Sequence, residues 1–431
     1  MPISIGKRLD DLKGIGPGFD HLRVGLALSI LTWHSFSISY GQDYGSTLAQ
    51  FPVPVLLAML LPMFFGLSGF LVMGSALRTG ELKTFITFRV LRILPALLTE
   101  ITISALVLGP LLTALPLRQY FTSPMFFEYF GSLIGRVRFS LPGLFLDNPA
   151  PQLVNFALWT VGPEILCYII MSLLLLTGAY RRVKAMTIIT IVYALATLAI
   201  GWIFPTHGSI EVLPAKLLIY CFLIGNLVFL YRDRLPFDWR IAAALFFAAM
   251  GLIYLTQAAQ MQALAYLAVP GLIYTVAVVG LSRLPKLPFF NRGDYSYGIY
   301  IYGFPIQQSI THFLPAYRTW YVNLALALPI TLLFAVASWH LIERPVLGLR
   351  KRILATGMKE PVKPSGRFTL KKTLLFGGLV AYGIFVIDAA TVLPLRPGVK
   401  MILYGFGLYQ YKANDVRPWT PLTVVPGAPS R

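Results

Sequence analysis

The chain of 431 residues is 57% hydrophobic and only 12% charged, and its 36 Lys and Arg against 17 Asp and Glu give a formal net charge of +19. This composition excludes a water-soluble globular domain and a disordered chain, and it is typical of an integral membrane protein. The positive charge would also suit a nucleic-acid-binding protein, but its distribution along the chain favours a membrane topology.

Apolar stretches long enough to cross a bilayer recur along the whole chain. A hydrocarbon core about 30 Å thick needs roughly 20 apolar residues per helix. Hydropathy, read together with the positions of the charged clusters, predicts helices over residues 22–40, 52–77, 90–113, 154–177, 185–204, 213–230, 240–256, 263–282, 294–314, 320–342 and 372–393. We therefore predict an all-α fold, a polytopic transmembrane helical bundle of eleven spans with a cytoplasmic N-terminus.

Lys and Arg gather in alternate connections of this predicted bundle. With a cytoplasmic N-terminus most of them fall on the inner side, whereas the connections 205–211 and 257–262 contain none. The positive-inside rule accounts for this pattern, so no nucleic-acid partner is expected. The first span follows a polar segment and is too long for the core of a signal peptide, so we expect it to remain as an anchor. The expected location is the plasma membrane, the inner membrane in a bacterium.

Composition also divides the chain into segments. These are a cytoplasmic N-terminal segment (1–21), a transmembrane core (22–343), a basic cytoplasmic linker (344–371), an extra span (372–393) and an external C-terminal tail (394–431). The outer connection 114–153 is rich in Tyr and Phe, which suit either sugar binding or anchoring at the membrane boundary. Cys167 and Cys221 lie in predicted spans and are interpreted as packing residues, so neither a disulfide framework nor a metal site is expected.

The first span contains an ionisable residue near its middle. His34 lies eleven residues after Arg23, which at about 1.5 Å per residue places it ~16 Å farther along and on the same helical face. An ionisable group inside a span is costly and is therefore a functional candidate. The alternative is a histidine that only bonds a carbonyl group or a neighbouring helix.

The next two spans offer small residues and a pair of arginines. Gly66, Ser68 and Gly69 would let another helix approach closely, or would leave room for an acyl or pantetheine chain. Arg89 and Arg92 are three residues apart, and so share one face of a helix at the cytoplasmic boundary. Two guanidinium groups so placed can bind phosphates, although arginines there can also extend to lipid headgroups.

The fourth span brings a carboxylate into the membrane region. Glu164 follows Trp159 by five residues and comes directly after Gly162 and Pro163, which loosen a helix. A carboxylate there is expected to face protein or a water-lined cavity. It could orient a histidine and stabilise its charged form during proton transfer.

Six motifs, in order along the chain, resemble those of the membrane-bound acyltransferases of the acyltransferase 3 type, which modify cell-surface carbohydrates. The motifs are the Asp20–Arg23–His34 opening, FFGLSGF, FRVLRILP, WTVGPE, GDYSYGIYIYGFPIQQ (293–308) and IERP (342–345). Each motif alone is weak, but six in family order are specific. The resemblance covers about residues 20–350.

This resemblance implies a ten-helix core that transfers an acyl group, most simply acetyl, from cytoplasmic acyl-CoA to a hydroxyl of a carbohydrate or lipid-linked saccharide. The family's essential histidine falls on His34, its first-helix arginine on Arg23, its glutamate on Glu164 and its arginine pair on Arg89 and Arg92. His34, Glu164 and Arg23 are then the expected catalytic residues, with His34 acting as general base or transient acyl carrier.

The remaining motif residues complete the expected site. Ser68 would join the arginine pair in binding the donor, and Asp20, Trp159 and Tyr297 are expected to contact substrate. The expected partners are thus the lipid bilayer, acyl-CoA and a carbohydrate acceptor. The chain departs from the family pattern at Gly303, where many members have histidine or another polar residue, so no second proton relay is expected there.

Two other classes of function remain open. A transporter or flippase for an anionic saccharide or lipid would use the same arginine, histidine and glutamate residues without a covalent step, but it leaves the order of the motifs unexplained. A structural subunit would account for the glycines but not for the ionisable groups inside the spans.

Overall fold

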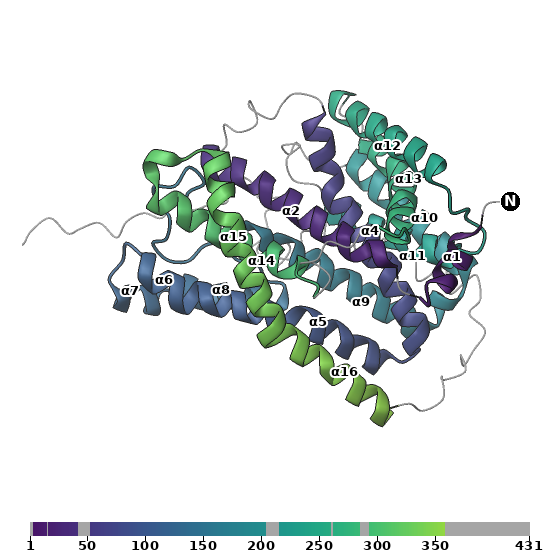
Figure 1. Cartoon of the computed structure of the whole chain (residues 1–431), viewed down its shortest axis with the longest axis horizontal. Helices are drawn as coiled ribbons and strands as arrows, with labels where there is room; N and C mark the ends of the chain where they lie inside the picture. The colour runs from purple at the N-terminus through teal and green to yellow at the C-terminus, as the bar shows by residue number, and fades with distance from the viewer. Residues whose placement is uncertain are drawn as a thin grey trace, which may run out of the picture.

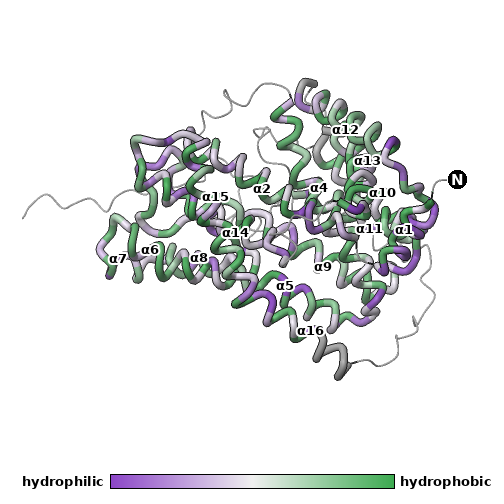
Figure 2. The backbone as a smooth tube through the Cα atoms, viewed as in Figure 1, coloured by the Kyte–Doolittle hydropathy of each residue, from purple (hydrophilic) through white to green (hydrophobic). Residues whose placement is uncertain are grey.

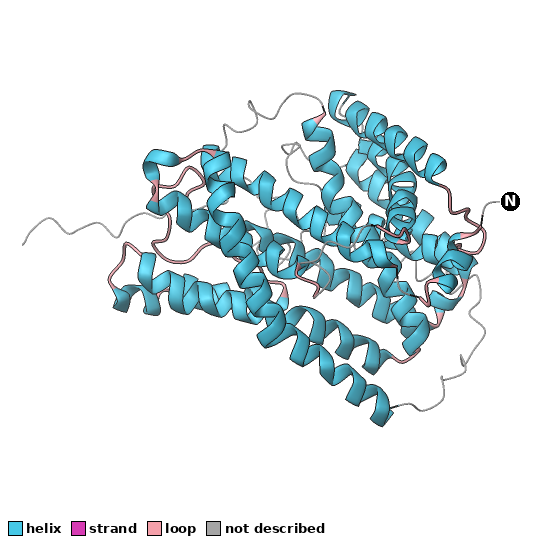
Figure 3. Cartoon of the chain, in the orientation of Figure 1, coloured by secondary structure: helices cyan, strands magenta, loops and turns pink. Residues whose placement is uncertain are grey.

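The computed structural model describes residues 3–14, 16–41, 52–203, 215–259, 262–284 and 293–357. Throughout these ranges the regular structure is helical, without a β-strand (Figure 3). The predicted all-α class is therefore confirmed. The predicted span 372–393 and the external tail 394–431 lie outside the described residues, so both remain predictions.

The first ten predicted spans each coincide with a helix. These are α2 (Pro17–Tyr40), α4 (Val53–Thr79), α5 (Leu82–Ile103) with η2 (Ser104–Leu108) and α6 (Gly109–Leu112), η4 (Phe156–Thr160) with α9 (Val161–Thr177), α10 (Val183–Ile203), α11 (Ala215–Leu230), α12 (Trp239–Ala259), α13 (Gln262–Gly280), α14 (Ser296–Phe313), and α15 (Trp320–Ser338) with η8 (Trp339–Glu343). Among the described residues, 7 helical stretches are long and apolar enough to cross a membrane, and α11 is a shorter apolar helix. Helices α2 and α14 fall outside this set because polar side chains interrupt them. The count of eleven spans and the orientation therefore stay predictions.

Shorter elements complete the described part of the chain. They are α1 (Ile5–Asp11), α7 (Leu117–Thr122), α8 (Pro124–Tyr129), η3 (Phe130–Ile134), η5 (Ala179–Arg181), η7 (Pro315–Tyr317) and α16 (Arg344–Gly357). Helix α5 begins earlier than predicted because no helix breaker precedes its apolar part, so Arg89 and Arg92 lie well inside it. The first half of the predicted linker is likewise helical, as α16.

Hydrophobic residues recur along the helices throughout the bundle, including those at its edges (Figure 2). Leu195, Phe247 and Leu333 belong to three different helices, and their exposed fractions are 62%, 68% and 67%. Large apolar side chains on so much of the surface are unfavourable in water but suit contact with lipid. The exposed surface thus agrees with a multi-pass membrane protein.

Helices α4 and α11 pack closely against each other, in the right-hand half of the view in Figure 1. A Cβ atom added at Gly69 would lie 2.1 Å from the carbonyl oxygen of Phe222, and one at Gly225 would lie 2.2 Å from the carbonyl oxygen of Gly66. Only glycine fits at these two positions, because the backbones themselves are in contact. The predicted close packing at this glycine-rich stretch is confirmed.

The long connection 114–153 folds back onto the bundle. Tyr120 and Tyr129 are fully buried in its own aromatic cluster, so these rings are core residues and are not available to a sugar. The side-chain amide of Gln308, on α14, donates hydrogen bonds to the carbonyl groups of Ala150 and Leu153 and accepts one from Asn148. The connection is therefore fixed to α14.

Candidate active site

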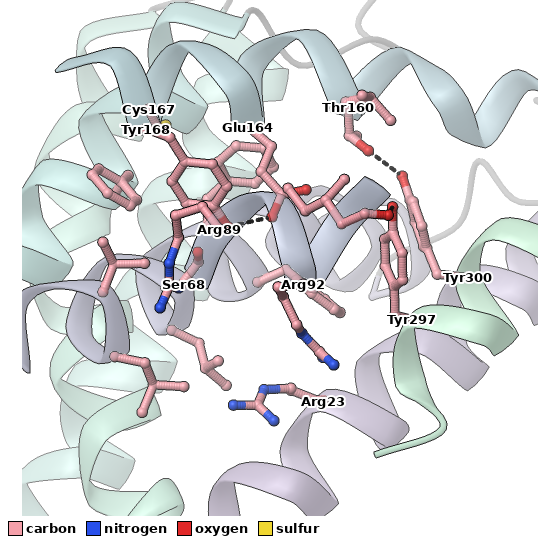
Figure 4. Close-up of a pocket in the computed structure, with 18 of the residues that line it drawn as sticks. Arg23, Ser68, Arg89, Arg92, Thr160, Glu164, Cys167, Tyr168, Tyr297 and Tyr300 are labelled. Atoms are coloured by element: carbon pink, nitrogen blue, oxygen red, sulfur yellow. Dashed lines mark hydrogen bonds between the residues drawn. The ribbon is translucent and has the colours of Figure 1, made fainter. Parts of the chain in front are cut away.

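A cavity of about 140 Å³ lies among helices α2, α4, α5, α9 and α14 (Figure 4). Its polar lining consists of Arg23, Ser68, Arg89, Arg92, Thr160, Glu164, Tyr168, Ser296, Tyr297 and Tyr300. Most of its remaining lining is apolar and comes from α4, including Phe64, Phe65 and Leu71. The structure thus brings six of the nine predicted site residues together: Arg23, Ser68, Arg89, Arg92, Glu164 and Tyr297.

The arginine pair projects into this cavity from α5. Nη2 of Arg89 donates a hydrogen bond to Ser75 Oγ at 3.1 Å, and its guanidinium group lies 5.7 Å from the ring centre of Tyr168. The guanidinium of Arg92 lies 6.0 Å from the ring centre of Tyr297. Aromatic faces stabilise guanidinium groups and hold them in place. Both cations are therefore fixed at the cavity wall.

Asp294, directly before α14, joins arginines from two helices. One of its carboxylate oxygens lies 2.7 Å from Nη1 of Arg23 and 2.6 Å from Nη2 of Arg92. Burial alone would raise the pKa of Asp294, but Arg92, Arg23 and a hydrogen bond from Ser296 together lower this pKa well below its ordinary value. The carboxylate therefore stays charged and holds α2, α5 and α14 together at one end of the cavity.

A second carboxylate approaches Arg92 from η8. Glu343 is 2% exposed, and its Oε2 lies 3.8 Å from Nη1 of Arg92, while its Oε1 accepts a hydrogen bond from Ser338 at 3.1 Å. The η8 segment is a π-helical turn, an irregularity that often accompanies functional sites. Arg92 is thus balanced by two acidic residues that lie far from it in the sequence.

Glu164 lies in the first turn of α9, where the positive end of the helix dipole favours a carboxylate. Its Oε1 accepts a hydrogen bond from the hydroxyl of Tyr168 at 2.7 Å (Figure 4). The electrostatic fields of Arg92 and Arg89 also reach it. The predicted contact with a histidine is absent among the described residues, because Glu164 lies at the arginine end of the cavity.

His34 lies beyond the end of the cavity that is opposite the arginines. Its ring packs edge-to-face against Phe304, with ring centres 5.1 Å apart, and it makes no hydrogen bond with the described residues. Phe304 follows Tyr300 by one turn of α14, and Tyr300 lines the cavity and bonds Thr160 at 2.7 Å. His34 is therefore separated from the arginines by the aromatic residues of α14, although it shares a face of α2 with Arg23.

The other two predicted site residues also lie outside the lining. Trp159, in η4, packs against the central hydrophobic core. Asp20 has a side chain that is 62% exposed and pairs with Arg23 at 2.9 Å. The structure thus places Asp20 at the arginine end, away from His34.

Sequence reasoning did not select four residues that complete the site: Asp294, Glu343, Tyr168 and Tyr300. Asp294 and Tyr300 lie in the GDYSYGIYIYGFPIQQ motif and Glu343 lies in IERP, so all three belong to motifs that carry the family resemblance. Their ionic and hydrogen-bonded partners are on other helices, and no local spacing indicates them. Tyr168 could have been found, because it lies one helical turn after Glu164.

A buried polar cluster lies at the C-terminal end of α5. Glu100 is 1% exposed, and its Oε1 accepts hydrogen bonds from Ser104 and Asn155, each at 2.9 Å. Asn155 also donates to the carbonyl group of Ile301, which ties η4 to α14. This cluster fixes the helices that carry Thr160 and Tyr300.

The residues described above define a multi-pass helical membrane protein whose cavity combines arginines from α2 and α5 with an apolar wall from α4. Within the described residues, no group of three or more His, Cys, Asp or Glu side chains is placed to hold a metal ion. The family model of the acyltransferase 3 type, an acyltransferase domain, matches residues 17–343, and the chain belongs to this family.

Two curated proteins are similar to the chain over most of their length. An O-acetyl transferase of Shigella phage Sf6 is 25% identical over 349 residues, which cover 76% of this chain and 95% of the relative. Nodulation protein 10 of Rhizobium leguminosarum bv. viciae is 27% identical over 384 residues, which cover 81% of this chain and 98% of the relative. No solved structure gives a significant match.

Proposed function

We propose that the protein is an O-acyltransferase of the plasma membrane, the inner membrane in a bacterium, that takes an acyl group, most simply acetyl, from cytoplasmic acyl-CoA and transfers it to a hydroxyl of a carbohydrate. The observation that carries this proposal is the cavity itself, with arginines at one end and His34 beyond the other. Membership of the acyltransferase family and the likeness to an O-acetyl transferase support the reaction type.

The cavity suits the two halves of an acyl-CoA molecule. Arg89 and Arg92 supply fixed guanidinium groups for phosphates, which they can bind through paired hydrogen bonds. The apolar wall from α4 suits the pantetheine arm and the acyl chain, with Ser68 among its polar positions. The thioester would then lie toward Tyr300 and His34.

The proposed reaction needs a base near the acceptor hydroxyl. His34 removes the proton from that hydroxyl, the oxygen attacks the thioester carbonyl carbon, the C–S bond breaks, and the CoA thiolate takes up a proton as it leaves. A neutral imidazole suits this step near pH 7. In the alternative route, a ring nitrogen of His34 attacks the thioester carbonyl carbon and the C–S bond breaks to release CoA as its thiol. The acceptor hydroxyl then attacks the acyl group, and the bond from the acyl carbon to the His34 nitrogen breaks as the hydroxyl proton returns to the imidazole.

The other predicted residues would support the donor site and the helices that carry it. Arg23 and Glu164 lie at the arginine end of the cavity, where they would help to hold Arg92 and Arg89 in position for the phosphates. Tyr297 supports Arg92 through its ring. Asp20 and Trp159 would act indirectly, Asp20 by holding Arg23 and Trp159 by fixing η4.

The test is to supply the purified protein in nanodiscs with acetyl-CoA labelled in the acetyl group and a cell-surface glycan fraction. Release of free CoA and transfer of label to the glycan would support the proposal. If CoA stays acylated with acetyl-CoA and with longer acyl-CoAs, while the protein moves a glycolipid between leaflets, the protein is a transporter and the proposal fails.

A further inference from the structure

Helix α16 brings an additional arginine to the arginine pair. The helix runs beside α5 (Figure 1), and Nη2 of Arg350 donates a hydrogen bond to the carbonyl oxygen of Phe88 at 2.8 Å. Its guanidinium also lies 5.2 Å from the ring centre of Phe88. Because Phe88 directly precedes Arg89, the packing of α16 places Arg350 close to Arg89.

The charges of this region are unevenly paired. Arg23 and Arg92 share the carboxylate of Asp294, and Arg92 also has Glu343. Arg89 and Arg350, by contrast, form no ion pair with any carboxylate in the described part of the chain. Arg350 is moreover repelled by both Arg89 and Arg92. Gathering like charges in this way is unfavourable unless an anion offsets them.

Both unpaired arginines have a buried N–H group without an acceptor. The Nε atoms of Arg89 and of Arg350 are each buried and have no hydrogen-bond partner among the described residues. Buried polar groups are almost always hydrogen-bonded, so each exception needs an explanation. Two adjacent guanidinium groups with spare donors match the several oxygens of a phosphate or diphosphate.

A purely structural role explains only part of this arrangement. Arg350 could serve to join α16 to α5 through Phe88, and Arg89 could serve to bond Ser75. Neither role uses the buried Nε groups, and neither offsets the repulsion between the two cations. A phosphate bound to both would do so.

We propose that Arg350 is a further substrate-binding residue, which holds the phosphate groups of the acyl donor's nucleotide together with Arg89. This inference rests on the proposed function for the identity of the donor. It assigns a part of the donor site to α16, which directly follows the family match and lies next to the residues that line the cavity. Arg350 thereby extends the phosphate site that Arg89 and Arg92 form, while Arg23 and Arg92 are held together by Asp294.

The experiment uses the full chain in neutral detergent. The variants are Arg350→Gln, Arg350→Lys and the charge-matched control Arg240→Gln, which alters an exposed arginine at the start of α12. The measurements are the KM and kcat for acetyl-CoA, the thermal midpoint, and the dissociation constant for inorganic pyrophosphate. Loss of a charge-assisted phosphate contact should raise the KM of Arg350→Gln about tenfold and leave kcat within about twofold.

The supporting result has three parts. The pyrophosphate affinity of Arg350→Gln falls by a factor similar to that of the KM, Arg350→Lys lies between Arg350→Gln and wild type, and Arg240→Gln behaves as wild type. Pyrophosphate binding that depends on Arg350, without any acyl-CoA turnover by wild type, would support the phosphate site while the proposed function fails.

Three results would overturn the inference. In the first, Arg350→Gln leaves both the KM and pyrophosphate binding unchanged. In the second, it lowers kcat and the thermal midpoint together without changing pyrophosphate binding, which is the signature of a structural role. In the third, Arg350→Gln changes the KM only in vesicles that contain an anionic lipid and not in neutral detergent. Arg350 would then bind a lipid headgroup.

Discussion

Asp294 and Arg92 lie 2.6 Å apart although 202 residues separate them in the sequence. The same carboxylate oxygen also lies 2.7 Å from Nη1 of Arg23, so one acidic side chain joins three helices at the arginine end of the cavity. Removing one partner of such a group leaves a buried charge without a counter-charge. The free-energy cost of that unpaired charge is larger than the net stabilisation that the intact pair provides. The arrangement therefore leads to direct tests of both stability and activity.

Replacing Asp294 with Asn should separate Arg23 from Arg92. We expect the acetyl-transfer kcat/KM to fall about 10- to 100-fold, because a buried charge pair is broken and the arginines lose their positions. The thermal midpoint in detergent should fall as well. Asp20→Asn is the matched control, because Asp20 also pairs with Arg23 but is mostly exposed, and its effect should be small. Equal effects of the two variants would contradict the account.

Asp294 should also give the protein an acid-sensitive stability. Its pKa in the folded protein is lower than in the unfolded chain, so its stabilising effect is complete above the unfolded pKa, about 4, and is lost as the pH falls below it. Thermal midpoints measured between pH 3 and pH 7 should fall at the acid end in wild type. The same decline should be shallower in Asp294→Asn, and identical slopes would argue against the ion pair.

Tyr300 should limit the length of the acyl group. Its hydroxyl bonds Thr160 at 2.7 Å, and the ring lines the cavity one turn before Phe304. Tyr300→Ala removes this wall and should raise the ratio of butyryl to acetyl transfer by about tenfold, since each accommodated CH₂ is worth ~0.8 kcal/mol. Competition between acetyl-CoA and butyryl-CoA measures the ratio. An unchanged ratio, with acetyl transfer retained, would place the acyl group elsewhere.

Close packing of α4 and α11 should make Gly69 intolerant of any side chain. The added Cβ of Gly69→Ala would lie 2.1 Å from the carbonyl oxygen of Phe222, so the helices must separate, at a cost of about 1–3 kcal/mol. Gly251→Ala is the control, because a Cβ added there meets nothing within 4 Å and alanine favours the helix. Thermal unfolding in detergent compares the two, and a midpoint for Gly69→Ala at or above that of the control would refute the packing argument.

The sequence predicted the helices well because the length and hydropathy of a span are local properties. It also placed Arg23, Arg89, Arg92 and Glu164 at one site, through the resemblance and the helical spacing. Asp294 and Glu343 were not predicted as site residues, because their partner Arg92 is distant in the sequence. These ion pairs form only when α14 and η8 pack against α5. The position of His34 could not be read from α2 alone, since it depends on where α14 places Phe304 and Tyr300.

In the proposed function, His34 performs the chemistry and does not bind the donor. The most direct measurement compares wild type, His34→Gln and the control His312→Gln, on α14, for both acetyl-CoA binding and acetyl transfer in the same preparations. General base catalysis contributes about 10²- to 10⁴-fold, so transfer by His34→Gln should fall by that factor while its donor affinity stays within about twofold. Transfer within tenfold of wild type, or donor binding lost together with transfer, would contradict the claim.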